Sequence, residues 1–266
     1  MRTTGTDGAS ARRRHAGGSG PASRVHAGDE LLAAVVRDLA ALRPVLAAAG
    51  FGLGVAVVSE PGAEPAGPAE AAAAASMPSR RRLEFLAGRR AARRALRAVG
   101  LDCGEIPRAG RLPVFPPGRA ASITHSEGIA VAVARGPGRD LPLGCDLELR
   151  PLPRGAARLV LHADEEALLG GDGDACGGGA AWSVTELFSA KEAAWKALAA
   201  AEGEHRDGPA RSLRELRASP CGDDLRVGAR AGLARTVRVR LERVGAAGVF
   251  SHVVGRAGDH GCAGGD

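Results

Sequence analysis

The sequence predicts a protein of mixed helices and strands that forms one globular unit with two lobes. Three observations lead to this prediction. The chain has 266 residues, enough to bury a sizeable core. Segments 31–49 and 77–99 carry apolar residues at helical spacing. Segments 129–134 and 236–241 are instead a short apolar run and an alternating run, both typical of strands.

The N-terminal elements follow in order. Residues 1–29 are rich in Gly, Ser, Arg and Ala and contain no apolar block, so we expect a disordered leader rather than a secretory signal. After the helix at 31–49, the valine-rich segment 51–59 predicts a buried strand. The proline-containing segment 61–68 indicates a turn or linker, and the alanine-rich segment 69–75 is compatible with a helix.

The segment 77–99 predicts a long basic amphipathic helix that ends at Gly100. Arg81 and Arg89 lie eight positions apart, a little over two turns, so both guanidinium groups could reach one side of the helix and hold a phosphate. A solvated basic face, or a surface for nucleic acid or membrane, fits the same spacing. The helix alone does not decide between them.

A loop rich in Pro and Gly at 108–118 leads into a predicted strand that contains His125, flanked by hydroxyl side chains. A histidine in this place is structural or catalytic, and its spacing does not say which. The glycine-rich segment 170–181 lacks the Lys-Ser/Thr ending of a phosphate-binding loop, so we expect a flexible insertion. Strands within 224–254 close the second lobe, and residues 256–266 are expected to be a disordered tail.

Two acidic motifs carry the chemistry. Asp146 and Glu148 are separated by one residue in an otherwise apolar segment, so in a strand their side chains share a face about 6.6 Å apart. Glu192 and Lys196 lie one turn apart on a predicted helix. Carboxylates in this number suit Mg²⁺, which takes a few protein oxygens and leaves room for substrate phosphates. Each motif also has a plainer interpretation. Asp146 and Glu148 could line the solvent face of an ordinary strand, and Glu192 and Lys196 could form an exposed ion pair on a helix, worth about 0.3 kcal/mol.

Composition narrows the function. The net charge is +6, there is no Tyr, and the five cysteines have no spacing typical of a zinc site or a disulfide framework. These features favour a reduced cytoplasm and argue against a single-strand binder that stacks bases on aromatic rings. Charged residues interrupt the apolar segment 31–58, which argues against a membrane span. A phosphate-bearing or acidic partner fits the charge.

In chain order, the motifs that carry a family resemblance are Arg81 with Glu84-Phe85-Leu86-Ala87-Gly88-Arg89, the loop 113–118 with Ser122-Ile123-Thr124-His125, Leu143-Gly144-Cys145-Asp146-Leu147-Glu148, and Phe188-Ser189-Ala190-Lys191-Glu192-Ala193-Ala194-Trp195-Lys196. The chain resembles, over about residues 31–254, the 4′-phosphopantetheinyl transferases of the larger, surfactin or enterobactin synthetase type. Two departures are Phe115 where the family often has Trp, and Cys145 in place of an aliphatic residue.

The resemblance implies an α+β, pseudo-twofold, two-lobed fold with the active site between the lobes. The N-terminal lobe would span 30–142 and the C-terminal lobe 143–255. It also implies the reaction of a holo-[acyl-carrier-protein] synthase: a serine of an apo carrier protein attacks the β-phosphate of coenzyme A, and adenosine 3′,5′-bisphosphate is released. The partners would be acidic acyl, polyketide or peptidyl carrier proteins, with no nucleic acid and no membrane, and the protein would act as a monomer in the cytoplasm.

Residue roles follow from the same resemblance. Asp146, Glu148 and Glu192 would hold Mg²⁺. Glu192 and Lys196 would be catalytic: Glu192 would accept the serine proton, directly or through a metal-bound water, and Lys196 would stabilise the leaving phosphate. The resemblance implies coenzyme A contacts at Arg81, Arg89, Arg108, Arg111, Thr124, His125, Asp146 and Lys196, with one of Arg108 and Arg111 filling the basic role of their loop. Glu165 matches a recurrent acid of the family. The alternatives are a basic nucleic-acid-binding protein and an inactive coenzyme A binding protein.

Overall fold

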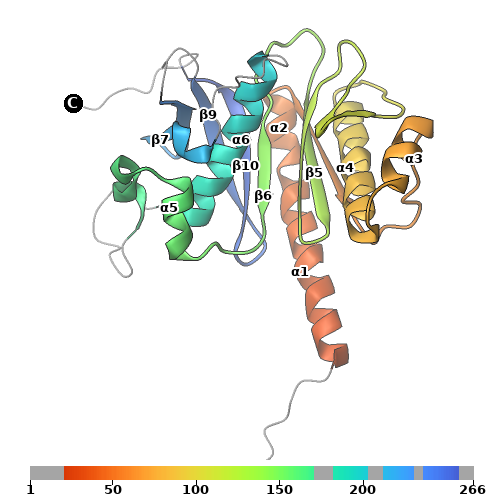
Figure 1. Cartoon of the computed structure of the whole chain (residues 1–266), viewed down its shortest axis with the longest axis horizontal. Helices are drawn as coiled ribbons and strands as arrows, with labels where there is room; N and C mark the ends of the chain where they lie inside the picture. The colour runs from red at the N-terminus through yellow and green to blue at the C-terminus, as the bar shows by residue number, and fades with distance from the viewer. Residues whose placement is uncertain (1–20, 171–181, 203–211, 231–235, 258–266) are drawn as a thin grey trace, which may run out of the picture.

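A computed structural model describes residues 21–170, 182–202, 212–230 and 236–257. The chain forms a mixed α+β structure, so the expected fold class is confirmed at this level. Most of the strands form two larger sheets, each with a long helix against one face, and two short strands form a separate hairpin (Figure 1). No described helix is long and apolar enough to cross a membrane.

The first sheet is antiparallel and has the strand order β1-β5-β4. Its helix α4 lies very close to β1 at Gly54. A Cβ at this position would stand only 2.0 Å from the carbonyl oxygen of Ala91. Only glycine permits this approach. The elements of this half are α1(Pro21–Ala41), α2(Arg43–Ala48), β1(Phe51–Val57), α3(Pro68–Ala75), α4(Ser79–Ala98), β2(Arg108–Ala109), β3(Leu112–Pro113), β4(Ala121–Ser126) and β5(Ile129–Arg135).

The second sheet is also antiparallel, with the order β6-β10-β9-β8-β7. Its helix α6 approaches the start of β6 at Gly144, where a Cβ would stand 1.9 Å from the carbonyl oxygen of Ala193. The elements of this half are β6(Cys145–Glu148), η1(Arg154–Ala156), α5(Ala157–Val160), η2(Ala163–Leu168), α6(Val184–Glu202), η3(Leu213–Glu215), β7(Leu216–Cys221), β8(Asp224–Ala229), β9(Thr236–Val244) and β10(Gly248–Arg256).

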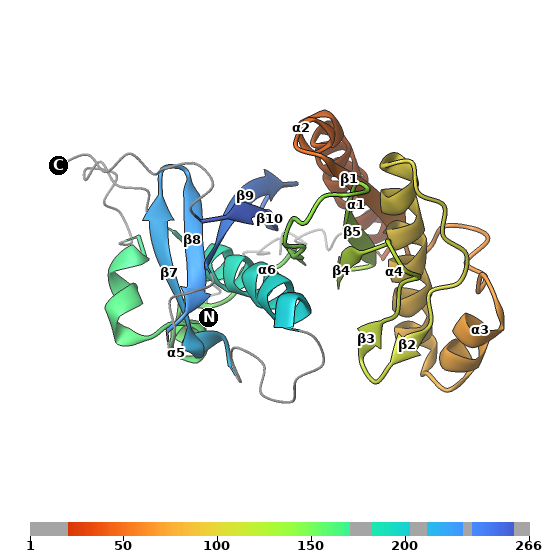
Figure 2. The same ribbon diagram turned by 90° about the horizontal axis from the view of Figure 1, so that it is seen from above.

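Three apolar clusters hold these layers together. One fills the space between α4 and the first sheet, and a second fills the space between α6 and the second sheet. The third joins the two halves, since Val131 of β5 belongs to it together with Leu147 of β6 and Phe250 of β10. Figure 2 shows α3, α4 and the β2–β3 hairpin on one side of the molecule, and β7 to β10 with α5 and α6 on the other. Strands β4 and β6 come from different sheets and meet between them.

Several details differ from the sequence-based expectations. Helix α1 begins at Pro21 and so includes residues 21–29, which were assigned to a disordered leader; a helix extends readily from a packed segment, here the one that buries Val35 and Leu39. The β2–β3 hairpin and β7 were not expected. Cys221 forms a disulfide that the cysteine spacing did not indicate. Strand β10 includes Arg256, the first residue of the expected tail, because Arg256 pairs with Val237 of β9. The remaining leader, residues 171–181 of the expected insertion 170–181 and the tail from 258 lie outside the described residues.

Candidate active site

A pocket of about 300 Å³ lies where β4, β6 and α6 meet. Its walls contain both acidic motifs and the histidine of the predicted strand. The lining residues are Ile123, Thr124, His125, Asp146, Glu148, Phe188, Glu192 and Lys196. The structure therefore brings most of the predicted site residues to one place, from three separate segments of the chain.

Asp146 is the most tightly held carboxylate of the pocket. Its side chain is buried, with 4% of the residue exposed. Oδ1 accepts hydrogen bonds from Lys196 Nζ at 2.8 Å and from Thr124 Oγ1 at 3.1 Å. Oδ2 is buried and has no hydrogen-bond partner among the described residues. A buried carboxylate oxygen without a partner is costly, so Oδ2 is a candidate for binding a ligand from outside the chain.

Glu148 follows Asp146 on the same face of β6. Burial raises the pKa of Glu148 to about 7, and the negative charges of Asp146 and Glu192 add to this effect. Glu192, across the pocket on α6, also has a raised pKa, caused by burial and by Asp146. Burial is the main cause of both shifts, and the neighbouring carboxylates add to it.

Lys196 lies one turn after Glu192 on α6. Burial acts to lower the pKa of Lys196, but its attraction to Asp146 outweighs burial, and the pKa is raised. Nζ also donates to the carbonyl oxygen of Cys145 at 3.0 Å. Lys196 is therefore a charged group held at the floor of the pocket, against β6.

The side chains of the pocket include possible ligands for the expected Mg²⁺. Among the described residues, no three His, Cys, Asp or Glu side chains are arranged as a ready-made metal site. The pocket nevertheless offers three carboxylates, with Asp146 Oδ2 lacking a partner and with raised pKa values at Glu148 and Glu192. This donor set fits a hard cation such as Mg²⁺.

His125 and Arg81 form a second polar pair at the pocket's edge. Arg81 Nη1 lies 2.7 Å from His125 Nε2, and the Arg81 side chain is 58% exposed. Burial lowers the pKa of His125, and the charge of Arg81 lowers it further, so the ring is neutral at pH 7. A neutral ring nitrogen accepts the Arg81 hydrogen bond, which leaves the other guanidinium donors for an anion.

Arg89 is not placed beside Arg81. Its residue is only 6% exposed, and it packs over the Phe85 ring with 4.5 Å to the centroid. Nε donates to the carbonyl oxygen of Ile106 at 2.8 Å, and Nη2 to that of Pro107 at 3.4 Å. Eight residues turn a helix by about 80° beyond two full turns, so Arg81 and Arg89 point in different directions. The expectation that both hold one phosphate from one line of the helix does not match this arrangement.

Arg108 and Arg111 belong to the exposed β2–β3 hairpin region and do not line the pocket. Arg108 Nε donates to the carbonyl oxygen of Gly110 at 2.7 Å. Burial lowers the pKa of Arg89 to about 10, and the nearby charge of Arg108 contributes to this shift. Arg108 therefore lies close enough to Arg89 to form one basic region with it.

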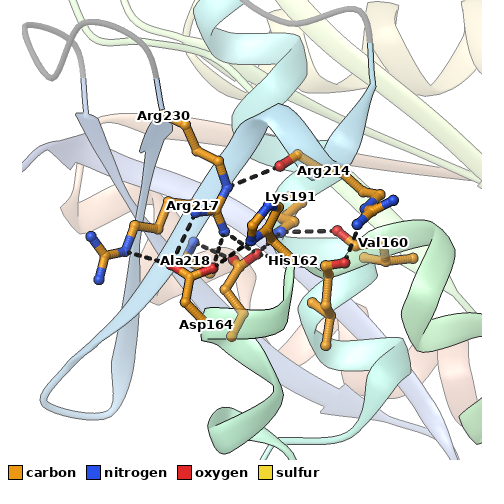
Figure 3. A network of polar contacts seen from close by, with 10 residues as sticks. Val160, His162, Asp164, Lys191, Arg214, Arg217, Ala218 and Arg230 are labelled. Atoms are coloured by element: carbon orange, nitrogen blue, oxygen red, sulfur yellow. Dashed lines mark hydrogen bonds and ion pairs between the residues drawn. The ribbon is translucent and has the colours of Figure 1, made fainter.

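A buried charge network, missed in detail by sequence reasoning, supports α6 from the far side (Figure 3). Lys191, with no exposed surface, donates to Glu165 Oε2 at 2.8 Å and to the carbonyl oxygen of Val160 at 2.9 Å. Glu165 also accepts from the backbone N–H of Ala218 at 2.7 Å and from Arg230 Nη2 at 2.7 Å. Lys191 adjoins Glu192 in sequence but faces away from the pocket. The match of Glu165 to a recurrent acid of the family was the signal for one member of this pair, and the sequence did not indicate its partner Lys191.

Comparison with known proteins gives two findings. A family model described as the 4′-phosphopantetheinyl transferase N-terminal domain matches residues 41–135. The chain is also similar to enterobactin synthase component D of Escherichia coli O157:H7, with 36% identity over 124 residues, covering 44% of this chain and 55% of that protein. The protein of the same name from Shigella flexneri matches with the same figures. The chain thus spans about half the length of the curated relatives it matches.

The matched N-terminal domain includes β1, α4, β4 and β5, which carry the Arg81 and His125 side of the pocket. These elements are the part of the chain that matches the phosphopantetheinyl transferase N-terminal domain. Together with the relatives, this match supports the assignment of the chain to the 4′-phosphopantetheinyl transferase superfamily.

The raised pKa of Glu148 leads to a prediction about stability. The folded protein holds this proton up to about pH 7, whereas an ordinary glutamate releases it near 4.5. The free energy of unfolding therefore falls as pH rises through this window. We expect Glu148→Gln to be more stable than the wild type at pH 8, by about 1 kcal/mol after solvent screening, and no more stable at pH 4.

Urea unfolding at the two pH values measures this difference. Adding Mg²⁺ at pH 8 should then stabilise the wild type more than the variant, because only the wild type keeps all three carboxylates. An equal stability difference at both pH values would contradict the prediction.

Proposed function

We propose that this protein is a Mg²⁺-dependent 4′-phosphopantetheinyl transferase that modifies a serine of an apo carrier protein. The observation that carries the proposal is the meeting of Asp146, Glu148, Glu192 and Lys196 in one pocket, with Asp146 Oδ2 left without a partner. We also infer that residues 30–142 and 143–255 are the two pseudo-twofold lobes. Each half contains an antiparallel sheet with a long helix, α4 or α6, packed against one face, and this supports the inference.

In the proposed reaction, the carrier serine oxygen forms a bond to the β-phosphorus of coenzyme A. The bond between that phosphorus and the bridging oxygen breaks, and adenosine 3′,5′-bisphosphate leaves. Glu192 accepts the serine proton, for which its raised pKa suits it. Lys196, charged and fixed against β6, stabilises the negative charge on the departing phosphate.

Asp146, Glu148 and Glu192 would hold Mg²⁺, which when bound supplies positive charge to the pyrophosphate. Arg81 and the neutral ring of His125 would bind the 3′-phosphate and adenosine end of coenzyme A. Of the two hairpin arginines, Arg108 is the stronger candidate for binding a phosphate of coenzyme A. Arg108 lies close enough to Arg89 for its charge to lower the pKa of Arg89. The contacts of Arg111 and Arg89 with this end of the substrate stay predictions. Arg89 would act indirectly, by holding the backbone carbonyl of Ile106 in place.

Intact-mass spectrometry tests the proposal. An apo carrier protein incubated with this protein, coenzyme A and Mg²⁺ is expected to gain the mass of one phosphopantetheine group, and to gain nothing when EDTA replaces Mg²⁺. If no carrier of fatty acid, polyketide or peptide synthesis gains mass while coenzyme A still binds, the protein is an inactive coenzyme A binding protein instead.

The proposed partners are acidic carrier proteins. We also propose that this protein acts on them as a monomer in the cytoplasm. With a net charge of +6, the protein would attract them over long range. We expect KM for the carrier protein to rise several-fold between about 0.05 and 0.5 M salt, because screening weakens such attraction. KM for coenzyme A should change less, because its phosphates are held at short range. A carrier KM that does not depend on salt would argue against electrostatic capture.

A further inference from the structure

A row of hydroxyl side chains joins the two sheets at their neighbouring edges. Strand β4 is an edge of the first sheet and β6 an edge of the second, so no continuous backbone ladder connects them. Instead, Ser122 Oγ accepts from Cys145 N–H at 3.1 Å, Thr124 Oγ1 from Leu147 N–H at 3.3 Å, and Ser126 Oγ from Leu149 N–H at 3.2 Å. We call these three contacts the hydroxyl ladder.

The ladder follows from strand geometry. Side chains at every second position of β4 point to the same face, and backbone N–H groups at every second position of β6 do the same. Each contact therefore spans 23 residues, and the register stays constant along the row. A hydroxyl can accept one hydrogen bond and donate another, which a backbone carbonyl cannot do.

The middle contact of the ladder uses this second capacity. Thr124 Oγ1 accepts from Leu147 N–H and donates its own hydrogen to Asp146 Oδ1 at 3.1 Å. Both Thr124 and Asp146 are buried. Across the described residues, neither Ser122 nor Ser126 hydrogen-bonds a carboxylate. Thr124 is thus the residue of the hydroxyl ladder that contacts a carboxylate of the pocket.

We propose that Thr124 is a positioning residue for Asp146, an inference that rests on the proposed metal site. Oδ1 is held from two directions, by the Thr124 hydroxyl and by Lys196 Nζ. Two donors on one oxygen fix the rotation of the carboxylate, and this leaves Oδ2 as the oxygen that can bind a cation. Hydrogen-bond partners of metal ligands commonly change metal affinity by 10-fold or more when removed. The Thr124 hydroxyl is therefore already used within the chain, rather than free to donate to a pyrophosphate.

Binding of Mn²⁺ to the protein alone, followed by electron paramagnetic resonance, tests this role without measuring transfer. Thr124→Val keeps the shape of the side chain and removes the hydroxyl, and we expect it to weaken Mn²⁺ binding about 10-fold. Thr124→Ser keeps the hydroxyl and should bind within about 3-fold of the wild type. If Thr124→Val does not fold, Thr124→Ala removes the same group from a smaller side chain.

Ser122→Ala is the matched control, because it removes one contact of the ladder that does not involve a carboxylate. We expect Ser122→Ala to lower the melting temperature but to leave Mn²⁺ affinity unchanged. Equal weakening of Mn²⁺ binding by Ser122→Ala, or unchanged binding by Thr124→Val, would overturn the positioning role. Absence of Mn²⁺ binding by the wild type would instead overturn the proposed metal site, and this inference with it.

Discussion

Asp146→Ala is expected to lower the rate of phosphopantetheine transfer about 1,000-fold, the largest effect of any single change in the pocket. Asp146 is the only pocket carboxylate that both offers a partnerless oxygen and holds Lys196. Its loss removes a proposed cation ligand and also releases Lys196 from its position against β6. The rate of carrier modification, followed by intact mass at saturating coenzyme A, measures the effect.

Asp140→Ala is the matched control for this prediction. Asp140 has the same side chain, but that side chain is 84% exposed, and its ion pairs within the described residues are with Arg135 and Arg256. We expect Asp140→Ala to retain the wild-type rate within about 2-fold and the wild-type stability within about 0.5 kcal/mol. A transfer rate for Asp146→Ala within 10-fold of the wild type would show that the reaction does not depend on this pocket.

Lys191→Met is expected to produce the largest loss of stability, about 3–5 kcal/mol in the free energy of unfolding. The substitution fills similar space but leaves Glu165, 1% exposed, without one of the two cations that pair with it. Burial acts to raise the pKa of Glu165, and the hydrogen bond from Lys191 helps to reverse this and lower it. Urea unfolding measures the loss.

Arg150→Met is the matched control for Lys191→Met. Arg150 also pairs with a glutamate, Glu127 at 2.5 Å, but its side chain is 78% exposed. Surface pairs contribute little, so we expect a loss below about 1 kcal/mol. If the two variants lose similar stability, the network in Figure 3 does not hold α6 against η2 and β7. Below its melting temperature, Lys191→Met should still modify carriers, because Lys191 does not line the pocket.

The sequence was sufficient to predict the elements with strong local patterns. The helix expected at 77–99 is α4, the strand expected at 51–59 is β1, and the alternating segment around 236–241 lies in β9. Asp146 and Glu148 were predicted to share a face of a strand, and they do. These features depend on residues a few positions apart, which is the range over which periodicity is informative.

Strand β7 was missed because its pattern is broken by Pro220, which an edge strand tolerates but which argues against a strand in sequence. The contacts of Glu165 with Lys191 and Ala218 span 26 and 53 residues, so no local pattern reports them. The position of Arg89 was misjudged for a different reason. The spacing from Arg81 gave the direction of the Arg89 side chain only to within a quarter turn of the helix. The position of the segment around Ile106, whose carbonyl accepts a hydrogen bond from Arg89, could not be predicted from the sequence.

The hydroxyl ladder has a consequence for how such a molecule is encoded. Any sequence can pair two strands through their backbones, but a joint made by side chains exists only where the right side chains recur. Ser122, Thr124 and Ser126 occupy alternate positions, and their partners Cys145, Leu147 and Leu149 repeat that interval. The ladder and the apolar cluster that contains Val131 and Leu147 together attach one half of the protein to the other. A single substitution in the ladder can therefore loosen this attachment without removing a backbone hydrogen bond of either sheet.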